Sequence, residues 1–175
     1  YFKENHFDVV INAVPHEVSV PAIKVEIEAG VNIVDMAFER DQMNLRSRAE
    51  EMGVTMVTGC GVDPGIGNML AGYGVVSVRN VENVKIYCGG LPKVPKPPLS
   101  YRILFHINSV WNVYTRKVRL IKNGTLQEVE PLTGIESVHV DGVGELEAFY
   151  TDGLASLVFT FMEDERFKGI KNMFE

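Results

Sequence analysis

The chain has 175 residues, a length that fits one ordinary domain or parts of two. With 46% hydrophobic and 23% charged residues, its composition is that of a globular protein and excludes a disordered chain. The net charge is -6 and there is no dense run of lysine and arginine, which argues against nucleic acid or an anionic membrane as the main partner.

Two cysteines, Cys60 and Cys88, are too few for a disulfide framework in a chain of this length, so we expect reduced thiols. The four histidines show no metal-ligand spacing with them, and we expect no metal. We find neither a signal peptide nor an apolar run that could span a bilayer. The cytoplasm is therefore the expected location.

The first third of the chain alternates between two kinds of pattern. Short apolar runs that favour strands are separated by segments with the apolar spacing of helices, and Gly30 and Gly53 follow the helices. The expected order is strand 7–14, helix 17–29, strand 31–34, helix 41–52 and strand 54–57. The first strand is almost continuously apolar, as in a strand covered on both faces. Such alternation predicts an α/β fold with a parallel sheet and right-handed connections.

A parallel sheet predicts a ligand site without any motif, because the carboxyl ends of its strands open on one edge. The segments 13–16, 35–38 and 58–63 follow the three expected strands and should meet there. The alternative is that they are ordinary connecting loops. The topology favours a site but names no ligand.

The segment Gly59–Gly65 is a poor match to a dinucleotide fingerprint, because its spacing is G-x-G-x-x-x-G and Pro64 lies within it. Proline suits the first position of a helix, and Asp63 would then be the N-cap. A helix start at Pro64 is therefore the simpler interpretation. We expect a true fingerprint ahead of Tyr1, outside this chain.

The second half changes character after a helix expected near 64–76. Four prolines within residues 92–98 predict an extended segment, either a linker or an ordered arm, and Asn123-Gly124 predicts a hairpin turn. The expected strands are 84–88, 101–107, 115–121, 127–129, 136–140, 145–150 and 155–161. We therefore expect part of a Rossmann-type domain at 1–78 and part of a mostly antiparallel α+β domain at 79–175.

Six segments, in this order, carry a resemblance to a known family: DVVINAVP at 8–15, GVDPG at 61–65, YCGGLP at 87–92, PLSY at 98–101, NG at 123–124 and GELEAFYT at 144–151. Together they are similar to the saccharopine dehydrogenase and lysine 6-dehydrogenase family. The resemblance implies a Rossmann cofactor domain and a substrate domain. It also implies hydride transfer between NAD or NADP and the carbon of a carbon–nitrogen bond in an amino acid, in a homodimer.

The resemblance also implies roles for individual residues. Cofactor contacts fall on the strand-end segments, at Ala13, Val14, Pro15, Asp35, Met36, Ala37 and Val62. Catalytic candidates are His16, whose alternative is a polar loop histidine, and Asp63, whose alternative is the helix cap. Substrate contacts fall on Asn108, Tyr150 and Thr151.

The substrate and the class of protein stay open. Fungal saccharopine reductases have a substrate-binding arginine near the position of Asn108, so its absence favours a lysine-type dehydrogenase over one that binds a substrate with several carboxylates. Arg102 or Arg116 could compensate if the strand there turned one of them inward. A non-catalytic interaction or assembly module with a Rossmann remnant is the alternative of another class. Without the fingerprint, we expect this chain alone to be inactive and to bind NAD(P) weakly.

Overall fold

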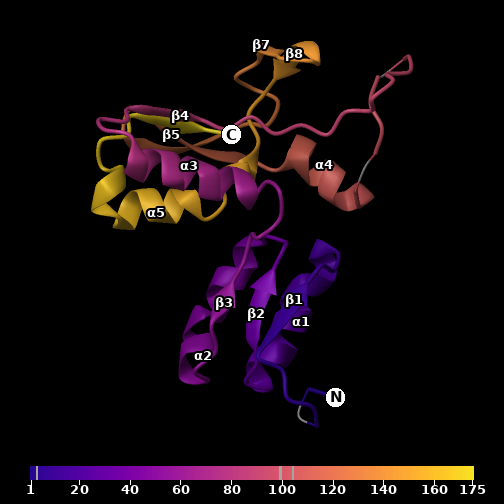
Figure 1. Ribbon diagram of the computed structural model, residues 1–175, viewed down its shortest axis with the longest axis vertical. Coiled ribbons are helices and arrows are strands. Elements are labelled where there is room, and N and C mark those ends of the chain that lie inside the picture. The colour runs from indigo at the N-terminus through magenta and orange to yellow at the C-terminus, as the bar shows by residue number, and fades with distance from the viewer. Residues whose placement is uncertain (3, 99, 104) are drawn as a thin grey trace. The chain divides into compact units, whose positions relative to one another are not determined.

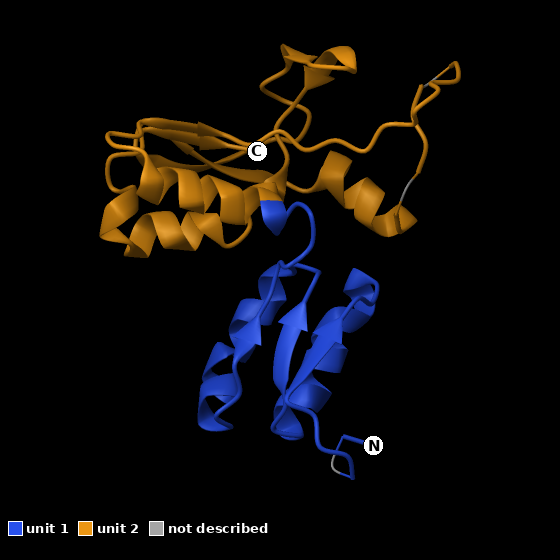
Figure 2. Ribbon diagram, in the orientation of Figure 1, with its two compact units in different colours: residues 1–66 blue, residues 67–175 orange. Residues whose placement is uncertain are grey.

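The computed structural model describes residues 1–2, 4–98, 100–103 and 105–175. The chain forms two compact units, Tyr1–Ile66 and Gly67–Glu175 (Figure 2). The helix that starts at Ile66 therefore belongs almost wholly to the second unit, whereas the sequence places the boundary after this helix.

The first unit is a three-stranded parallel sheet with the order β1-β2-β3 (Figure 1). Its elements are β1 (Val9–Asn12), α1 (His16–Glu28), β2 (Asn32–Asp35), the 3-10 helix η1 (Arg40–Leu45), α2 (Arg46–Glu51) and β3 (Met56–Val57). The prediction of a parallel α/β sheet is confirmed. The second predicted helix divides into a 3-10 turn and a short α-helix.

Only one face of this sheet is covered by the residues that the structure describes. Ile33 packs against Ile23 and Ile27 of α1 and against Ala49 of α2, and all four side chains are buried. Side chains alternate along a strand, so Ile11 points to the opposite face, where it is 66% exposed. Val57 on β3 is exposed as well. The expectation that the first strand is covered on both faces is therefore wrong for this chain.

The second unit contains a four-stranded sheet with the order β4-β9-β5-β6 and a separate hairpin, β7-β8. β4 pairs with β9 in parallel, whereas the other pairs are antiparallel, as predicted for most of this half. The strands are β4 (Asn83–Lys85), β5 (Val118–Lys122), β6 (Thr125–Val129), β7 (Glu136–Val140), β8 (Gly144–Ala148) and β9 (Asn172–Phe174). Asn123 and Gly124 both have positive φ, as a type I′ hairpin turn requires.

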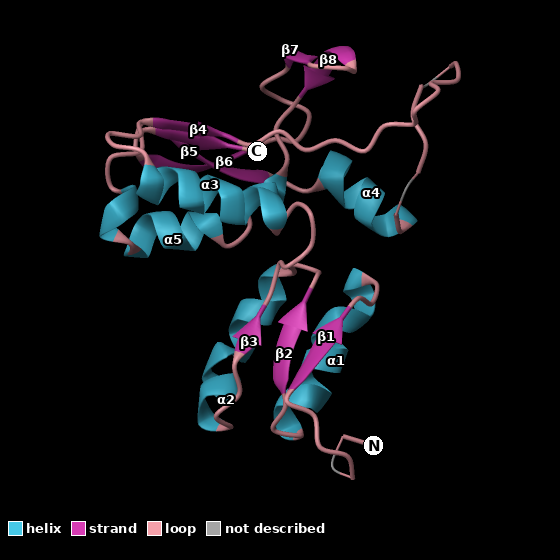
Figure 3. Cartoon of the chain, viewed as in Figure 1, coloured by secondary structure: helices cyan, strands magenta, loops and turns pink. Residues whose placement is uncertain are grey.

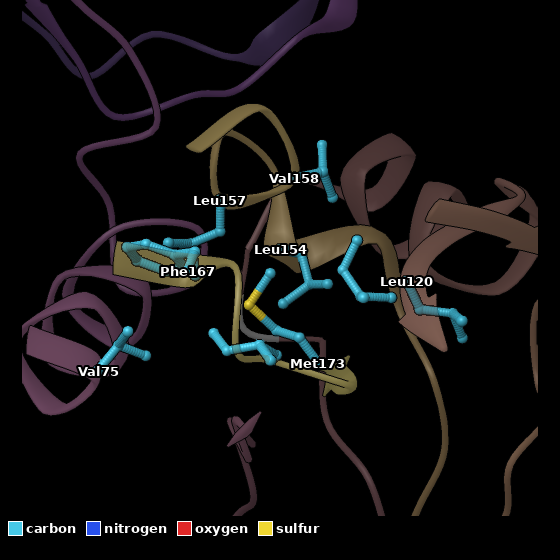
Figure 4. Close-up of a cluster of buried hydrophobic side chains, with 9 residues drawn as sticks. Val75, Leu120, Leu154, Leu157, Val158, Phe167 and Met173 are labelled. Carbon is cyan, nitrogen blue, oxygen red and sulfur yellow. The ribbon is translucent and has the colours of Figure 1, made fainter. Parts of the chain in front are cut away.

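Helices α3 (Ile66–Ser77) and α5 (Leu157–Glu163) lie on one side of the four-stranded sheet (Figure 3). The remaining helices are α4 (Ile107–Thr115) and two 3-10 turns, η2 (Asp152–Leu154) and η3 (Glu165–Phe167). The core joins Val75 of α3, Leu157 of α5 and Met173 of β9 with the neighbouring strands and turns (Figure 4). Since β9 lies between β4 and β5, Met173 is fully buried and central to this core.

Two predicted strands are wrong. Residues 155–161 were expected to form a strand, but Leu157–Glu163 form α5, because a short apolar run fits a buried helix as well as a buried strand. Residues 101–107 were also expected to form a strand. Their described residues contain no strand, and Ile107 begins α4. Leu104 lies outside the described residues. The argument that placed Arg102 and Arg116 by strand alternation therefore does not apply.

The proline-rich segment has no regular element among its described residues, in agreement with its sequence. It lies between β4 and α4, which both belong to the second unit, so it does not connect the two units. Within the described part of the chain, no helix is long and apolar enough to cross a membrane.

Candidate functional site

Three backbone hydrogen bonds join the segments that follow the parallel strands. The amide of Met36 donates to the carbonyl of Asn12 at 3.0 Å, that of Gly59 to Ala37 at 2.9 Å, and that of Cys60 to Asp35 at 2.9 Å. The ends of β1 and β2 and the loop after β3 therefore meet at one edge, as the topology predicts. We call this edge, formed by residues 12–16, 35–38 and 58–63, the strand-end edge.

The surface of the strand-end edge is largely apolar. Ala13, Val14 and Pro15 are exposed, Met36 is 48% exposed and Val62 is 66% exposed. Large exposed apolar side chains grouped at a strand-end loop are typical of a surface that a flat ring or another apolar group covers. Their cofactor-binding role stays a prediction.

Asp35 differs from its neighbours because its carboxylate points into the unit and is 1% exposed. Its Oδ1 accepts a hydrogen bond from the amide of Ala37 at 2.6 Å, and its Oδ2 accepts from Ser19 Oγ at 2.8 Å and from Asn12 Nδ2 at 3.4 Å. The side chain thus fixes the turn after β2 from inside. Burial raises the pKa of the nearby Cys60 thiol, and the charge of Asp35 raises it further.

His16 is the first residue of α1 and follows Pro15, which occupies the N-cap position. Its Nδ1 lies 3.3 Å from Oε2 of Glu17. A carboxylate beside one ring nitrogen orients the imidazole ring. The role of His16 in proton transfer stays a prediction.

The loop from Gly61 to Ile66 is held by hydrogen bonds between its own backbone groups. The Gly61 amide donates to the Pro64 carbonyl, and the Ile66 amide donates back to the Gly61 carbonyl, both at 3.0 Å. Gly65 has φ +146°, and a Cβ there would lie 1.9 Å from the Gly61 oxygen, so this turn requires glycine. α3 begins at Ile66, which corrects the expected helix start at Pro64 and removes Asp63 from the N-cap. Asp63 precedes Pro64 through a cis peptide bond and is half-buried.

The helix starts near the strand-end edge are poorly suited to a pyrophosphate. Pyrophosphate binds to free amides at a helix N-terminus. α1 begins after a proline and carries Glu17 in its first turn, which repels anions. The amides of Gly61 and Ile66 are used within their own loop. Neither of these two helix starts therefore offers the free amides that a pyrophosphate needs.

The predicted substrate residues lie in the second unit, and two of them are tied to other side chains. The Tyr150 ring stacks on Phe174 with 5.0 Å between ring centroids and lies against Gly134, where a Cβ would be 2.1 Å from the ring. The Thr151 hydroxyl donates to the carboxylate of Glu175. Asn108 is exposed at the start of α4. Tyr150 and Thr151 are neighbours in the chain, and their contacts lie with the C-terminal residues Phe174 and Glu175.

A buried ion pair supports the loop beside Thr151. Arg119 of β5 donates from Nε to Oδ1 of Asp152 at 2.9 Å and from a terminal nitrogen to Oδ2 at 3.1 Å, and its backbone amide also donates to Oδ1. The side chains are 11% and 6% exposed. Asn68 of α3 donates to the carbonyls of Gly153 and Leu154. The hydrogen bonds from Arg119 of β5 and from Asn68 of α3 together fix the position of η2.

Sequence patterns gave no role to the buried polar residues of the first unit: Asn12, Ser19, Glu26 and Gln42. One signal was present, because Ser19 and Glu26 fall on the same helical stripe as the apolar Ile23 and Ile27. Polar residues on a core-facing stripe must find partners inside the protein.

The fold is that of an α/β protein in which three parallel strands end at one edge. Comparison with known proteins identifies the family to which the chain belongs. Residues 61–173 match the family model described as the saccharopine dehydrogenase C-terminal domain. Because this match covers more than half of the sequence, the chain belongs to the saccharopine dehydrogenase family.

Two named proteins are similar to parts of this chain. The chain is 32% identical over 90 residues to the mitochondrial alpha-aminoadipic semialdehyde synthase of Mus musculus, covering 49% of this chain and 10% of the mouse protein. It is 26% identical over 129 residues to the NADP(+), L-glutamate-forming saccharopine dehydrogenase of Pyricularia oryzae, covering 70% of this chain and 29% of that protein.

A solved structure shows the same fold. The apo, histidine-tagged, L-Glu-forming saccharopine dehydrogenase of Saccharomyces cerevisiae superposes with a TM-score of 0.72 at 18% identity. The match covers 99% of this chain and 40% of the yeast chain. The chain thus spans less than half the length of each of these three relatives.

Proposed function

We propose that the intact protein is an NAD(P)-dependent oxidoreductase that acts on the carbon–nitrogen bond of an amino acid in lysine metabolism, as saccharopine dehydrogenases do. The observation that carries the proposal is the family match over residues 61–173. The convergence of three strand ends at one apolar edge supports it, because such an edge is where ligands of parallel α/β sheets bind.

When bound, NAD(P) supplies the hydride acceptor. The chain contributes an apolar surface, Ala13, Val14, Pro15 and Met36, that suits the nicotinamide ring and keeps water from it. His16, at the end of this surface, accepts the proton that the substrate nitrogen releases as the carbon–nitrogen bond is oxidised. Asp63, in the loop that follows β3 on the same edge, is the second candidate for proton transfer.

The exposed apolar face of the β1-β2-β3 sheet supports a role within a larger enzyme. Ile11 and Val57 lie on this face, in register through Val34 of β2. A parallel sheet is stable in water when both faces are covered. In the intact enzyme we expect other segments to cover this face and to supply the phosphate-binding loop.

The chain favours lysine or another monocarboxylate amine over saccharopine. Asn108 is neutral, and Arg119, the arginine tied to the Tyr150–Thr151 loop through Asp152, has its guanidinium bonded to that carboxylate. A second buried substrate carboxylate would lack the paired hydrogen bonds that an arginine provides. The experiment is a comparison of kcat/KM for lysine and saccharopine with NAD+ and with NADP+, using the intact protein. A clear preference for saccharopine would show that another arginine binds the extra carboxylate.

A further inference from the structure

A network of five buried polar side chains lies behind the strand-end edge. It joins Asn12 of β1, Ser19 and Glu26 of α1, Asp35 of β2 and Gln42 of η1, and all are between 0% and 6% exposed. Gln42 Nε2 donates to Ser19 Oγ at 2.8 Å, and Ser19 Oγ donates to Asp35 at 2.8 Å. The network therefore links β1, α1 and η1 to the end of β2.

Two carboxyl groups share one amide in this network. Asn12 Nδ2 donates to Oε2 of Glu26 at 2.9 Å and to Oδ2 of Asp35 at 3.4 Å. Two carboxylates this close in a buried site do not both carry a charge, because their repulsion is poorly screened there. One of them must hold a proton.

The hydrogen bonds indicate which carboxyl group is the better candidate for the proton. Asp35 accepts three hydrogen bonds, from Ala37, Ser19 and Asn12, as a charged carboxylate does. Glu26 accepts one, from Asn12. Charge is more stable on the group with more donors, so the negative charge belongs on Asp35 and the proton on Glu26.

Within the described part of the chain, no positive side chain pairs with either carboxyl group. Among the described residues, no lysine, arginine or histidine forms an ion pair or hydrogen bond with either group. The neighbours from β1, α1 and η1 are the uncharged Asn12, Ser19 and Gln42, and the titratable group from β2 is Asp35 itself. The Cys60 thiol, after β3, is close enough for the charge of Asp35 to raise its pKa.

We propose that Glu26 keeps its proton in the folded protein at neutral pH and acts as a positioning residue, because its neutral carboxyl lets the Asn12 amide hold the ends of β1 and β2 together. Oε2 accepts from Asn12, so the proton resides on Oε1. Burial raises the pKa of Glu26, the hydrogen bond from Asn12 lowers it, and the charge of Asp35 raises it.

The network fixes the two segments predicted to contact the cofactor. Asn12 immediately precedes Ala13–Pro15, and Asp35 holds the amide of Ala37. Ionisation of Glu26 would place two like charges on one amide and loosen both segments. This consequence for the cofactor rests on the proposed function, whereas the protonation state of Glu26 does not.

Infrared spectroscopy tests the protonation state directly. At neutral pH the exposed acids are ionised, so a carbonyl stretch of a protonated carboxylic acid reports a buried neutral acid. We expect this band in the wild-type chain and in the control Glu163→Gln, which changes an exposed glutamate on α5, and not in Glu26→Gln. A wild-type spectrum without the band, or a band that persists in Glu26→Gln, overturns the proposal.

The pH dependence of unfolding gives a second readout. A raised folded-state pKa means that the native state binds more protons than the unfolded state above the unfolded pKa, so stability falls as pH rises until the folded pKa is passed. Within that window the folding constant of the wild type should fall by about tenfold per pH unit relative to Glu26→Gln. Glu163→Gln should follow the wild type. Parallel curves for wild type and Glu26→Gln contradict the proposal.

The amide of Ala37 reports the positioning role. In nuclear magnetic resonance spectra its proton shift depends on the hydrogen bond to Asp35. Glu26→Gln retains an acceptor for Asn12 and should keep the neutral-pH shift, and Glu26→Leu should change it. If the Glu26→Leu shift equals that of the wild type, or if Glu26→Gln moves it, Glu26 does not position this turn. Because none of the three measurements uses activity, their failure is distinct from failure of the proposed enzyme.

Discussion

Removal of the carboxylate of Asp152 should strongly destabilise the second unit. The change Asp152→Ala leaves the Arg119 guanidinium buried without the two hydrogen bonds, at 2.9 and 3.1 Å, that compensate it. Breaking a buried ion pair from one side costs about 3–5 kcal/mol. Asp152→Asn keeps one acceptor and should cost about 2 kcal/mol.

Urea denaturation followed by circular dichroism measures these changes. The control is Asp164→Ala, which removes a carboxylate that also binds an arginine, Arg166, but at the surface, where water replaces the lost contacts. We expect a much smaller effect from this control. The double variant Arg119→Met with Asp152→Leu should regain much of the loss, since apolar residues of similar volume often replace a buried pair without cost.

A loss of less than about 1 kcal/mol in the free energy of unfolding for Asp152→Ala would refute this reasoning. Removing the carboxylate that pairs with a buried guanidinium should destabilise the protein by more than that. An equal cost for Asp152→Ala and Asp164→Ala would refute it as well. In either case Arg119 would have to find another acceptor near η2, and its guanidinium would then be available to a substrate carboxylate.

Three further predictions concern the strand-end edge and its loops. Gly65→Ala should destabilise the chain by about 2 kcal/mol or more, because its Cβ collides with Gly61, whereas Gly72→Ala, in open space on α3, should stabilise it by about 0.5–1 kcal/mol; thermal unfolding compares the two. Calorimetric titration of this chain with NADH and NADPH should show weak binding or none, and micromolar binding would contradict the assignment of the phosphate site to other segments. In the intact enzyme, His16→Gln should lower kcat by about a hundredfold with little change in cofactor affinity, and full turnover would reduce His16 to a loop residue.

The parallel sheet and the meeting of its strand ends at one edge could be predicted because alternation along the chain is a local pattern. The apolar runs around Ile11, Ile33 and Met56, each followed by a helical segment or a loop, indicate parallel strands whose carboxyl ends share one edge. Coverage of the second face could not be predicted, since it depends on what packs there and not on the strand sequence.

The errors in the second half have a physical cause. Leu157–Phe161 is apolar and short, so its periodicity does not separate a buried helix from a strand, and the outcome is decided by packing against Val75 and Met173. The cofactor role of Asp35 came from its place at a strand end, whereas the direction of its carboxylate depends on Asn12 and Ser19, which are distant in sequence. Side-chain direction at a strand end is a tertiary property.

The central claim is that the intact protein oxidises the carbon–nitrogen bond of an amino acid. The direct measurement is the reduction of NAD+ and NADP+ by the purified intact protein in the presence of lysine or saccharopine, with a preparation lacking either amino acid as the control. We predict turnover that depends on the amino acid and falls in the His16→Gln variant. A folded intact protein that reduces neither cofactor with either substrate would contradict the claim and support a binding or assembly role.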